Sequence, residues 1–394
     1  MLKSRQRRSL LERRPITGVP GEPRKILLVS SYVVSQLGGV EQYNEWLRLR
    51  LVARGFECRV VSCDHKNAIA DAKLPYRPLG PRAWPFVAPS PRVINLLRRE
   101  VAWADIVFIQ YHAYPLSLWA ALAAFSRRKP AWTFIHMVAP PSFRSKLYRA
   151  IAWAYDRIAA RVTLRFAHPV AVSAVAADFI ESRFRIPPVR APFPMRPLPT
   201  RPHVPAPNPG EPLRVVSAGR LSDVKRPLDV IAACDLVKGG PVQLDIYGTG
   251  PLEQEVRAMA ATRPWVTVHG AVPWELAVAA QGYAHSVISA SVMDTTQAAL
   301  LEPMAMGVPA VATNTGDAFR YFEPPLERFL TPQDQPQALA DGLDLLRSDY
   351  SGWQQKFAIR GQELSAMFGE DAAERAVLEA AGLVNTKFQE HSQR

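Results

Sequence analysis

A chain of 394 residues is too long for one ordinary hydrophobic core, so we expect two domains. Its composition, 48% hydrophobic and 21% charged, is typical of a globular protein and excludes the disordered and fibrous classes. The net charge of +13 would suit a phosphate-bearing partner, but no recognition motif accompanies it, so we expect no nucleic-acid partner.

Three cysteines without a CxxC pair argue against a disulfide framework and a structural zinc. No apolar run is long enough to span a membrane, and no hydrophobic segment follows the basic N-terminus. We therefore expect a cytoplasmic protein. Residues 1–25 hold eight bases and two acids, which predicts a disordered basic tail over 1–24 that can touch anionic surfaces.

The first half of the chain alternates strand and helix patterns. Near-continuous apolar runs predict parallel strands buried on both faces at 25–30, 58–62, 105–110, 131–136 and 169–173. A crossover helix is predicted over 39–55, ending at Gly55. Gly38 and Gly39 precede this helix, where glycines let a bulky ligand lie against the backbone or simply make a tight turn.

Two histidines, His112 and His136, end strands of this half. A lone histidine is more often structural than catalytic, but both strand ends belong to the edge where ligands of such sheets bind.

The segment 142–168 is basic and amphipathic. It can rest on anionic lipid, or it can pack on its own sheet with a solvated basic face. Its expected apolar stripe consists of Leu147, Ile151, Tyr155, Ile158, Val162 and Phe166.

A proline-rich connector separates the two halves. Residues 186–212 contain 11 prolines, a density that excludes a helix or a central strand. We predict a first domain over 25–190, a linker over 191–212, a second domain over 213–370, and a C-terminal helix with a frayed end over 371–394.

After the linker the alternation resumes, with predicted strands at 213–219, 242–248, 266–270, 286–291 and 309–313. The chain is therefore expected to be an α/β protein of two doubly wound, Rossmann-like domains facing a central cleft, where ligands bind.

Three stretches of the second half carry candidate site residues. Arg220 and Lys225 lie on a strand-to-helix loop, where two cations either clamp a diphosphate or remain solvated. Gly248 and Gly250 form a turn after the next strand that permits close backbone approach.

The third stretch is SVMDTTQAALLEPMAMGVPAVAT, residues 291–313. Asp294 is expected at or just before the N-terminus of a short helix, with Glu302 within about 80° on the same face. Pro303 should kink that helix at a cost of up to about 3 kcal/mol. The two acids either bind a ligand or act as a helix cap and a surface charge; the apolar neighbours favour the ligand.

These elements, in this order, resemble the retaining glycosyltransferases of family 4, which have the GT-B fold. The matching pieces include GGVEQYNEWLRLRLVARG, VAVSAVAADFI, GRLSDVKR, DIYGTGPLEQEV and LLEPMAMGVPAVAT.

The resemblance implies a role for each candidate. Arg220 and Lys225 would bind the donor diphosphate, with Gly38 and Gly39 near it. Asp294 would contact hydroxyls of the donor sugar and Glu302 the ribose, because carboxylates accept paired hydrogen bonds from vicinal hydroxyls. His136 would lie near the reacting sugar, with His136 and Asp294 as the catalytic pair.

The resemblance also has a departure. The family usually has Glu-Gly-Phe-Gly where this chain has Asp294-Thr295-Thr296-Gln297, and these four residues would line the donor sugar. No Asp-x-Asp triplet is present, so we expect neither a metal nor a cofactor, only a nucleotide-diphosphate sugar as donor. The acceptor would be a glycan or a lipid-linked saccharide, in surface polysaccharide or glycolipid synthesis, with peripheral contact to the inner face of an anionic membrane. A sugar-nucleotide 2-epimerase and a degenerate binding protein without transfer activity stay as alternatives.

Overall fold

A computed structural model describes residues 24–30, 39–64, 76–81, 91–111, 115–136 and 146–383. Gly38, His112, nearly all of the expected basic tail and the C-terminal end after residue 383 lie outside the described residues.

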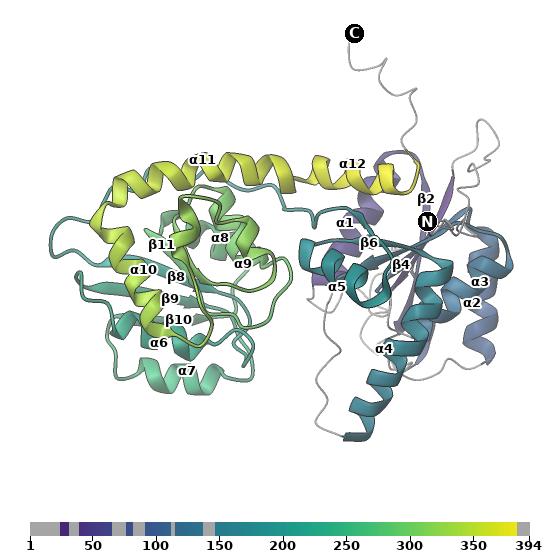
Figure 1. The fold of residues 1–394 in the computed structure, drawn as a ribbon, viewed down its shortest axis with the longest axis horizontal. Coiled ribbons are helices and arrows are strands. Elements are labelled where there is room, and N and C mark those ends of the chain that lie inside the picture. The colour runs from purple at the N-terminus through teal and green to yellow at the C-terminus, as the bar shows by residue number, and fades with distance from the viewer. Residues whose placement is uncertain are drawn as a thin grey trace, which may run out of the picture. The chain divides into compact units, whose positions relative to one another are not determined.

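The chain forms two compact units (Figure 1). The first comprises residues 1–134, 140–169 and 378–394, and the second comprises residues 135–139 and 170–377. Residues 170–190, expected in the first domain, thus group by distance with the second unit. The reason is local, because the helix that follows residue 173 is hydrogen-bonded to residue 317, as described below.

A parallel sheet of seven strands, in the order β3-β2-β1-β4-β5-β6-β7, contains all the strands predicted in the first half. β1 pairs with β2 on one side and β4 on the other, and every residue of β4 and β5 is buried, as their unbroken apolar sequences predict. The strands are β1 (Lys25–Ser30), β2 (Glu57–Asp64), β3 (Tyr76–Pro81), β4 (Ile106–Gln110), β5 (Ala131–Ile135), β6 (His168–Ala171) and β7 (Val189–Arg190).

Helices follow the strands of this sheet in alternation. The predicted crossover helix is confirmed, and Gly55 after it has the positive φ of a helix C-terminus. The helices are α1 (Gly39–Ala53), α2 (Pro91–Trp103), α3 (Pro115–Ser126), α4 (Lys146–Phe166) and α5 (Ala174–Phe184). None of the helices within the described residues is both long and apolar enough to cross a membrane.

The second sheet has six parallel strands in the order β10-β9-β8-β11-β12-β13. Its order reverses between β8 and β11, which is the pattern of a doubly wound nucleotide-binding sheet. The strands are β8 (Leu213–Ala218), β9 (Val242–Tyr247), β10 (Val266–Gly270), β11 (Ser286–Ser289), β12 (Ala310–Thr313) and β13 (Leu330–Thr331).

Helices connect and cover this second sheet. They are α6 (Pro227–Asp235), α7 (Glu253–Ala260), α8 (Trp274–Tyr283), α9 (Ala298–Ala305), the 3-10 helices η2 (Gly316–Arg320) and η3 (Leu326–Phe329), α10 (Pro336–Ser348), α11 (Tyr350–Phe368) and α12 (Glu370–Ala380). Two doubly wound α/β sheets therefore confirm the predicted fold class.

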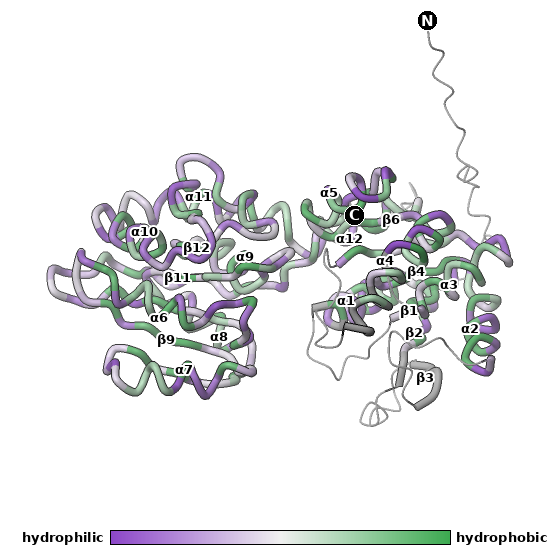
Figure 2. The backbone as a smooth tube through the Cα atoms, turned by 60° about the horizontal axis from the view of Figure 1, so that its bottom comes forward, coloured by the Kyte–Doolittle hydropathy of each residue, from purple (hydrophilic) through white to green (hydrophobic). Residues whose placement is uncertain are grey.

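Apolar strands form the centres of both units. In Figure 2 most of the tube through β4 has the colour of hydrophobic residues, in agreement with the burial of this strand. The proline-rich connector over 186–212 contains no helix; its regular structure is the two-residue strand β7 and a bridge between Met195 and Gly369. Arg201 fixes it to the second unit by donating to the carbonyl oxygens of Gly282, Ala284 and Gly307.

Three residues of the apolar stripe expected on α4, Leu147, Ile151 and Tyr155, have side chains outside the described part of the structure. Of the other three, Ile158 is exposed, whereas Val162 and Phe166 are half-buried. The buried residues of α4 are Ala159, Ala160, Thr163 and Leu164, and the helix packs on α3.

Candidate active site

The candidate site is a pocket at the carboxyl ends of β8, β9 and β11, where the strand order of the second sheet reverses. Parallel sheets bind ligands at this place because the loops on either side diverge there. The pocket encloses about 410 Å³, including the space open to solvent. Its lining consists of Ser217, Ala218, Gly219, Arg220, Leu221, Lys225, Pro227, Tyr247, Ser289, Ser291, Asp294, Gln297, Ala299 and Leu300.

The loop after β8 brings two cations to this pocket, as the sequence predicted. Arg220 is exposed, and no acidic side chain in the described part of the chain pairs with it. Lys225 forms an ion pair with Asp294 across the pocket. The main chain reinforces this contact, because Val292 N donates to Val224 O at 2.9 Å. Four of the predicted residues, Arg220, Lys225, Asp294 and Gln297, therefore line one pocket.

The turn after β9 holds the β8 loop in place. A Cβ atom at Gly248 would lie 1.8 Å from Gly219 O, and one at Gly250 would lie 2.2 Å from Leu221 O. Leu221 N donates to Thr249 O at 3.0 Å between the same two loops. The close approach that these glycines permit is thus to the chain's own backbone, and neither glycine lines the pocket.

Asp294 does not cap α9. The helix begins four residues later, at Ala298, with Gln297 as its N-cap residue. The Asp294 carboxylate instead accepts from Thr295 N at 2.9 Å and from Lys225. Because Asp294 is outside the helix, the helical angle expected between it and Glu302 does not apply.

Gln297 has φ +46°, in the left-handed region. Glycine is the residue that adopts this conformation without strain. Gln297 adopts this left-handed conformation although it has a side chain. Its Nε2 donates to Thr315 O at 3.2 Å. Its Oε1 is buried without a partner in the described structure, as is Oγ1 of Thr296. A left-handed backbone and unpaired polar atoms at one pocket wall are typical of a functional site.

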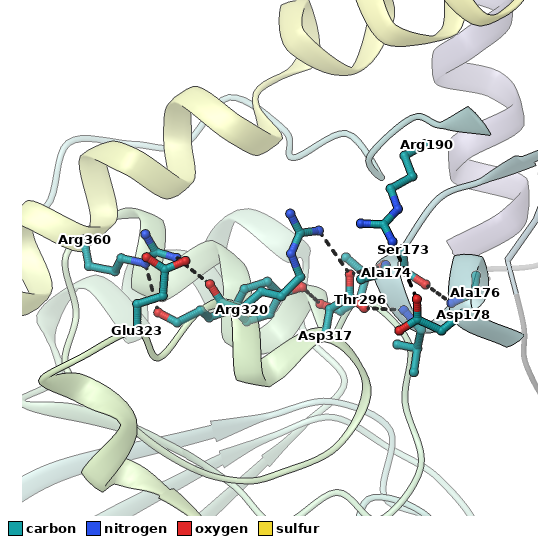
Figure 3. Close-up of polar contacts among 12 residues, drawn as sticks. Ser173, Ala174, Ala176, Asp178, Arg190, Thr296, Asp317, Arg320, Glu323 and Arg360 are labelled. Carbon is teal, nitrogen blue, oxygen red and sulfur yellow. Dashed lines mark hydrogen bonds and ion pairs between the residues drawn. The ribbon is translucent and has the colours of Figure 1, made fainter. Parts of the chain in front are cut away.

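The segment η2 supports this wall from behind (Figure 3). Asp317 N donates to Thr295 O at 2.7 Å, and the Tyr321 hydroxyl donates to Thr296 O. A Cβ atom at Gly316 would lie 2.4 Å from Thr295 O, so η2 and the 294–297 loop are in direct backbone contact. The 294–297 loop is therefore fixed by hydrogen bonds from Asp317 and Tyr321.

Asp317 also binds the start of α5, as Figure 3 shows. Its fully buried carboxylate accepts from Ala174 N at 2.8 Å and Val175 N at 3.0 Å. Ser173 accepts from Ala176 N, so three free amides of the helix end have side-chain acceptors. Burial raises the pKa of Asp317, and the two amides act in the opposite direction. Sequence reasoning missed this residue, although its place just after β12 was a usable signal.

Pro303 lies inside α9, as predicted. It has no N–H to donate to the carbonyl of Ala299, four residues earlier. The buried side chain of Gln281 donates to that carbonyl oxygen at 3.2 Å instead. Part of the expected cost of the proline is therefore offset by a side chain from α8.

Glu302 lies on α9 but is not among the described residues that line the pocket. Its Oε2 accepts from Trp274 Nε1 at 2.9 Å. Burial raises the pKa of Glu302, while the Trp274 bond and the charge of Arg196 lower it. The Arg196 guanidinium lies 5.0 Å from the centre of the Trp274 ring. Glu302 thus belongs to a half-buried polar cluster next to the pocket helix.

His136 follows β5 and is buried. Burial lowers its pKa to about 3, so the imidazole is neutral at neutral pH. It can exchange hydrogen bonds with hydroxyls but supplies no positive charge. Gly39 is the first residue of α1.

Chemically, the pocket offers cations for an anionic group and a carboxylate with adjacent polar atoms for hydroxyls. No cluster of three or more His, Cys, Asp or Glu side chains suited to a metal occurs within the described residues. Metal independence stays an expectation.

Sequence profiles of two glycosyltransferase families match the two halves of the chain. Glycosyltransferase Family 4 matches residues 37–191, and Glycosyl transferases group 1 matches residues 212–349. A comparison with curated protein sequences gave no match.

Several solved structures share the fold at low sequence identity. HepE of Anabaena, solved in complex with UDP, has a TM-score of 0.72 and 16% identity over 92% of this chain and 100% of its own. A glycosyltransferase of Rickettsia africae has a TM-score of 0.70 and 17% identity over 92% and 99%. Sucrose-phosphate synthase of Thermosynechococcus elongatus has a TM-score of 0.69 and 16% identity over 91% and 98%.

The two Rossmann-like sheets, together with these structural matches, define the GT-B fold. The two profiles together cover most of the chain, and the chain belongs to glycosyltransferase family 4. It is accordingly a glycosyltransferase, an enzyme that transfers a sugar to an acceptor.

Proposed function

We propose that this enzyme transfers a sugar, with retention of the anomeric configuration, from a nucleoside diphosphate donor to a glycan or lipid-linked saccharide. The observation that carries the proposal is the Lys225–Asp294 ion pair beside Arg220 in the pocket of the second sheet. Two cations and one carboxylate at the carboxyl ends of β8 and β11 suit a diphosphate joined to a polyhydroxyl group.

The pair supports a specific order of events. Lys225 and Asp294 form an ion pair and so neutralise one another. A donor diphosphate competes for Lys225, and the released carboxylate of Asp294 can then accept hydrogen bonds from sugar hydroxyls. Each charged group changes partner without being left unpaired, which avoids the high cost of a lone charge.

Departure of the nucleotide breaks the bond between the anomeric carbon and the diphosphate oxygen. Arg220 and Lys225 stabilise the negative charge that develops on this leaving group. The acceptor hydroxyl oxygen bonds to the same carbon on the same face, and its proton passes to the departing diphosphate. Neutral His136 serves this step as a hydrogen-bonding group for the donor sugar.

The donor sugar is expected against Thr295, Thr296 and Gln297. The unpaired buried atoms of Thr296 and Gln297 are suited to sugar hydroxyls, since a ligand would satisfy them. Glu302, with Trp274, is proposed to hold the ribose. HepE was solved with UDP and with UDP-glucose, and a uridine donor is the first candidate to test.

The test is transfer from a panel of UDP-, GDP- and ADP-sugars, with the anomeric configuration of the product read by NMR. Lys225→Ala and Asp294→Ala should each lower kcat/KM for the donor by about a hundredfold or more, because each removes a charged contact from the transition state. The matched control is Lys238→Ala, an exposed lysine outside the pocket, which should change nothing.

Unchanged turnover in both pocket variants would refute the site. Product with the opposite anomeric configuration would refute retention while leaving the site intact.

A further inference from the structure

The carboxylate of Glu302 is held by residues from two distant parts of the chain. Trp274, the first residue of α8, donates its indole N–H to Oε2 of Glu302 at 2.9 Å. Arg196, on the proline-rich connector, has its guanidinium 5.0 Å from the centre of the Trp274 ring. All three residues are half-buried. The connector, α8 and α9 therefore meet in one cluster beside the pocket.

The backbone of the connector is fixed where Arg196 leaves it. Met195 N donates to Phe368 O at 2.7 Å, and Met195 forms a bridge with Gly369. The Met195 side chain is buried in the core of the second sheet, and Leu198 packs against the same core. Arg196 thus lies between two anchored residues, and this limits where its guanidinium can lie.

α8 is attached to α9 near both of its ends. The bond from Trp274 to Glu302 lies at its start, and the bond from Gln281 to the Ala299 carbonyl lies near its end. The two helices also pack against each other. The indole is therefore a fixed support, and its N–H is a directional donor to the carboxylate.

This arrangement leaves the second carboxylate oxygen open. In the described part of the chain no group donates to Oε1 of Glu302, and Oε1 is not among the buried atoms without a partner, so a ligand can reach it. Burial raises the pKa of Glu302, and the Trp274 bond and the charge of Arg196 oppose this. Both partners thus favour an ionised carboxylate with one oxygen held and one oxygen free.

We propose that Trp274 and Arg196 are positioning residues for the ribose contact of Glu302, so that the proline-rich connector forms part of the donor site. The inference rests on the proposed function, in which Glu302 accepts hydrogen bonds from the ribose. The indole fixes the orientation of the carboxylate, and the cation holds the indole. The ribose is remote from the bond that breaks, so loss of either support should weaken donor binding equally in the ground state and the transition state.

The test combines donor kinetics with calorimetric binding of UDP, GDP and ADP, each compared with its deoxyribose form. For the nucleotide that binds, wild-type protein should prefer ribose about tenfold, the size expected for one hydrogen bond to a charged group. Glu302→Ala should remove this preference. Trp274→Phe keeps a ring but has no N–H; it should raise the donor KM about fivefold, leave kcat within about twofold, and lower the ribose preference to about twofold.

The arginine is tested by a pair of variants. Arg196→Gln should raise the donor KM about threefold, and Arg196→Lys should restore it, because an ammonium group also interacts with an aromatic face. Arg328→Gln is the matched control. Arg328 lies 5.9 Å from the centre of the Trp353 ring and does not line the pocket, so its loss should change neither the donor KM nor the ribose preference. Melting temperatures show whether each variant is folded.

Two results separate this proposal from the proposed function. If Glu302→Ala loses the ribose preference and a folded Trp274→Phe variant keeps it in full, the positioning role is overturned while the ribose contact stands. If Glu302→Ala keeps the preference, the ribose contact is refuted and the positioning role with it; the Lys225 and Asp294 variants then still decide whether the pocket is the transfer site. A fall of kcat and melting temperature together in Trp274→Phe, with the preference unchanged, would assign the cluster to stability alone and overturn the proposal.

Discussion

Replacing Asp317 with alanine should destabilise the second unit strongly. The carboxylate is 0% exposed and accepts from two main-chain amides, Ala174 N and Val175 N, at the start of α5. The partners are more than 140 residues apart in sequence, so the bond closes a long loop between α5 and η2. Alanine leaves the space but provides no acceptor.

The size of the effect follows from this geometry. Each buried amide left without an acceptor costs about 1–3 kcal/mol, so two cost about 2–6 kcal/mol. Burial of the charged carboxylate is itself unfavourable, and this desolvation raises the pKa of Asp317. The alanine variant no longer bears this desolvation cost, which offsets part of the loss. We expect a net loss of about 2–5 kcal/mol, a large share of the stability of an ordinary domain. Asp317→Asn keeps one acceptor oxygen and should lose about half as much.

Urea unfolding followed by far-UV circular dichroism and by tryptophan fluorescence measures the loss. Hydrogen exchange then locates it, because the amides of residues 174 and 175 should exchange faster in the variant. UDP binding should weaken as well, since Asp317 N also holds Thr295, which follows the pocket residue Asp294.

Asp178→Ala is the control. This carboxylate is 66% exposed and pairs with Arg190 at 3.5 Å, also visible in Figure 3, so its loss should change stability by less than about 0.5 kcal/mol. If Asp317→Ala unfolds at the same urea concentration as Asp178→Ala, with α5 protected as before, the reasoning is refuted.

Two further predictions concern buried polar groups. Burial lowers the pKa of His136 from 6.5 to about 3, so the unfolded chain takes up its proton first. The contribution of His136 to the free energy of unfolding should therefore be constant above pH 6.5. Below that, the free energy of unfolding should fall by about 1.4 kcal/mol per pH unit from pH 6.5 towards 3. His136→Gln should flatten the urea-unfolding profile in that window; an unaltered slope would contradict the burial argument. Gln281→Leu should cost about 1–3 kcal/mol, because it leaves the Ala299 carbonyl unpaired opposite Pro303. Gln337→Leu, on the exposed face of α10, should cost almost nothing, and equal melting temperatures for the two variants would exclude this role of Gln281.

Much of the fold could be predicted from the sequence because buried parallel strands are unbroken apolar runs. β4 and β5 follow this rule and were predicted almost to the residue. β3 contains two prolines, and β7 and β13 have two residues each, so no pattern marks them. Such short edge pairings are set by tertiary packing.

The site was predicted in part for a similar reason. Arg220, Lys225 and Asp294 follow predicted strands, and the strand ends of a parallel sheet meet at one edge. Which of them pair, and where α9 begins, depends on contacts between distant segments. The Lys225–Asp294 pair spans 69 residues and the Asp317 bonds span more than 140, which no local pattern encodes.

The interlocked turns after β8 and β9 have a consequence for redesign. Gly248 and Gly250 never touch the pocket, yet a side chain at either would collide with the main chain that carries Arg220. The loop proposed to bind the diphosphate is thus held by a neighbouring turn that tolerates no side chain. Variation aimed at a new donor sugar belongs at residues 295–297, while the two glycines must be kept.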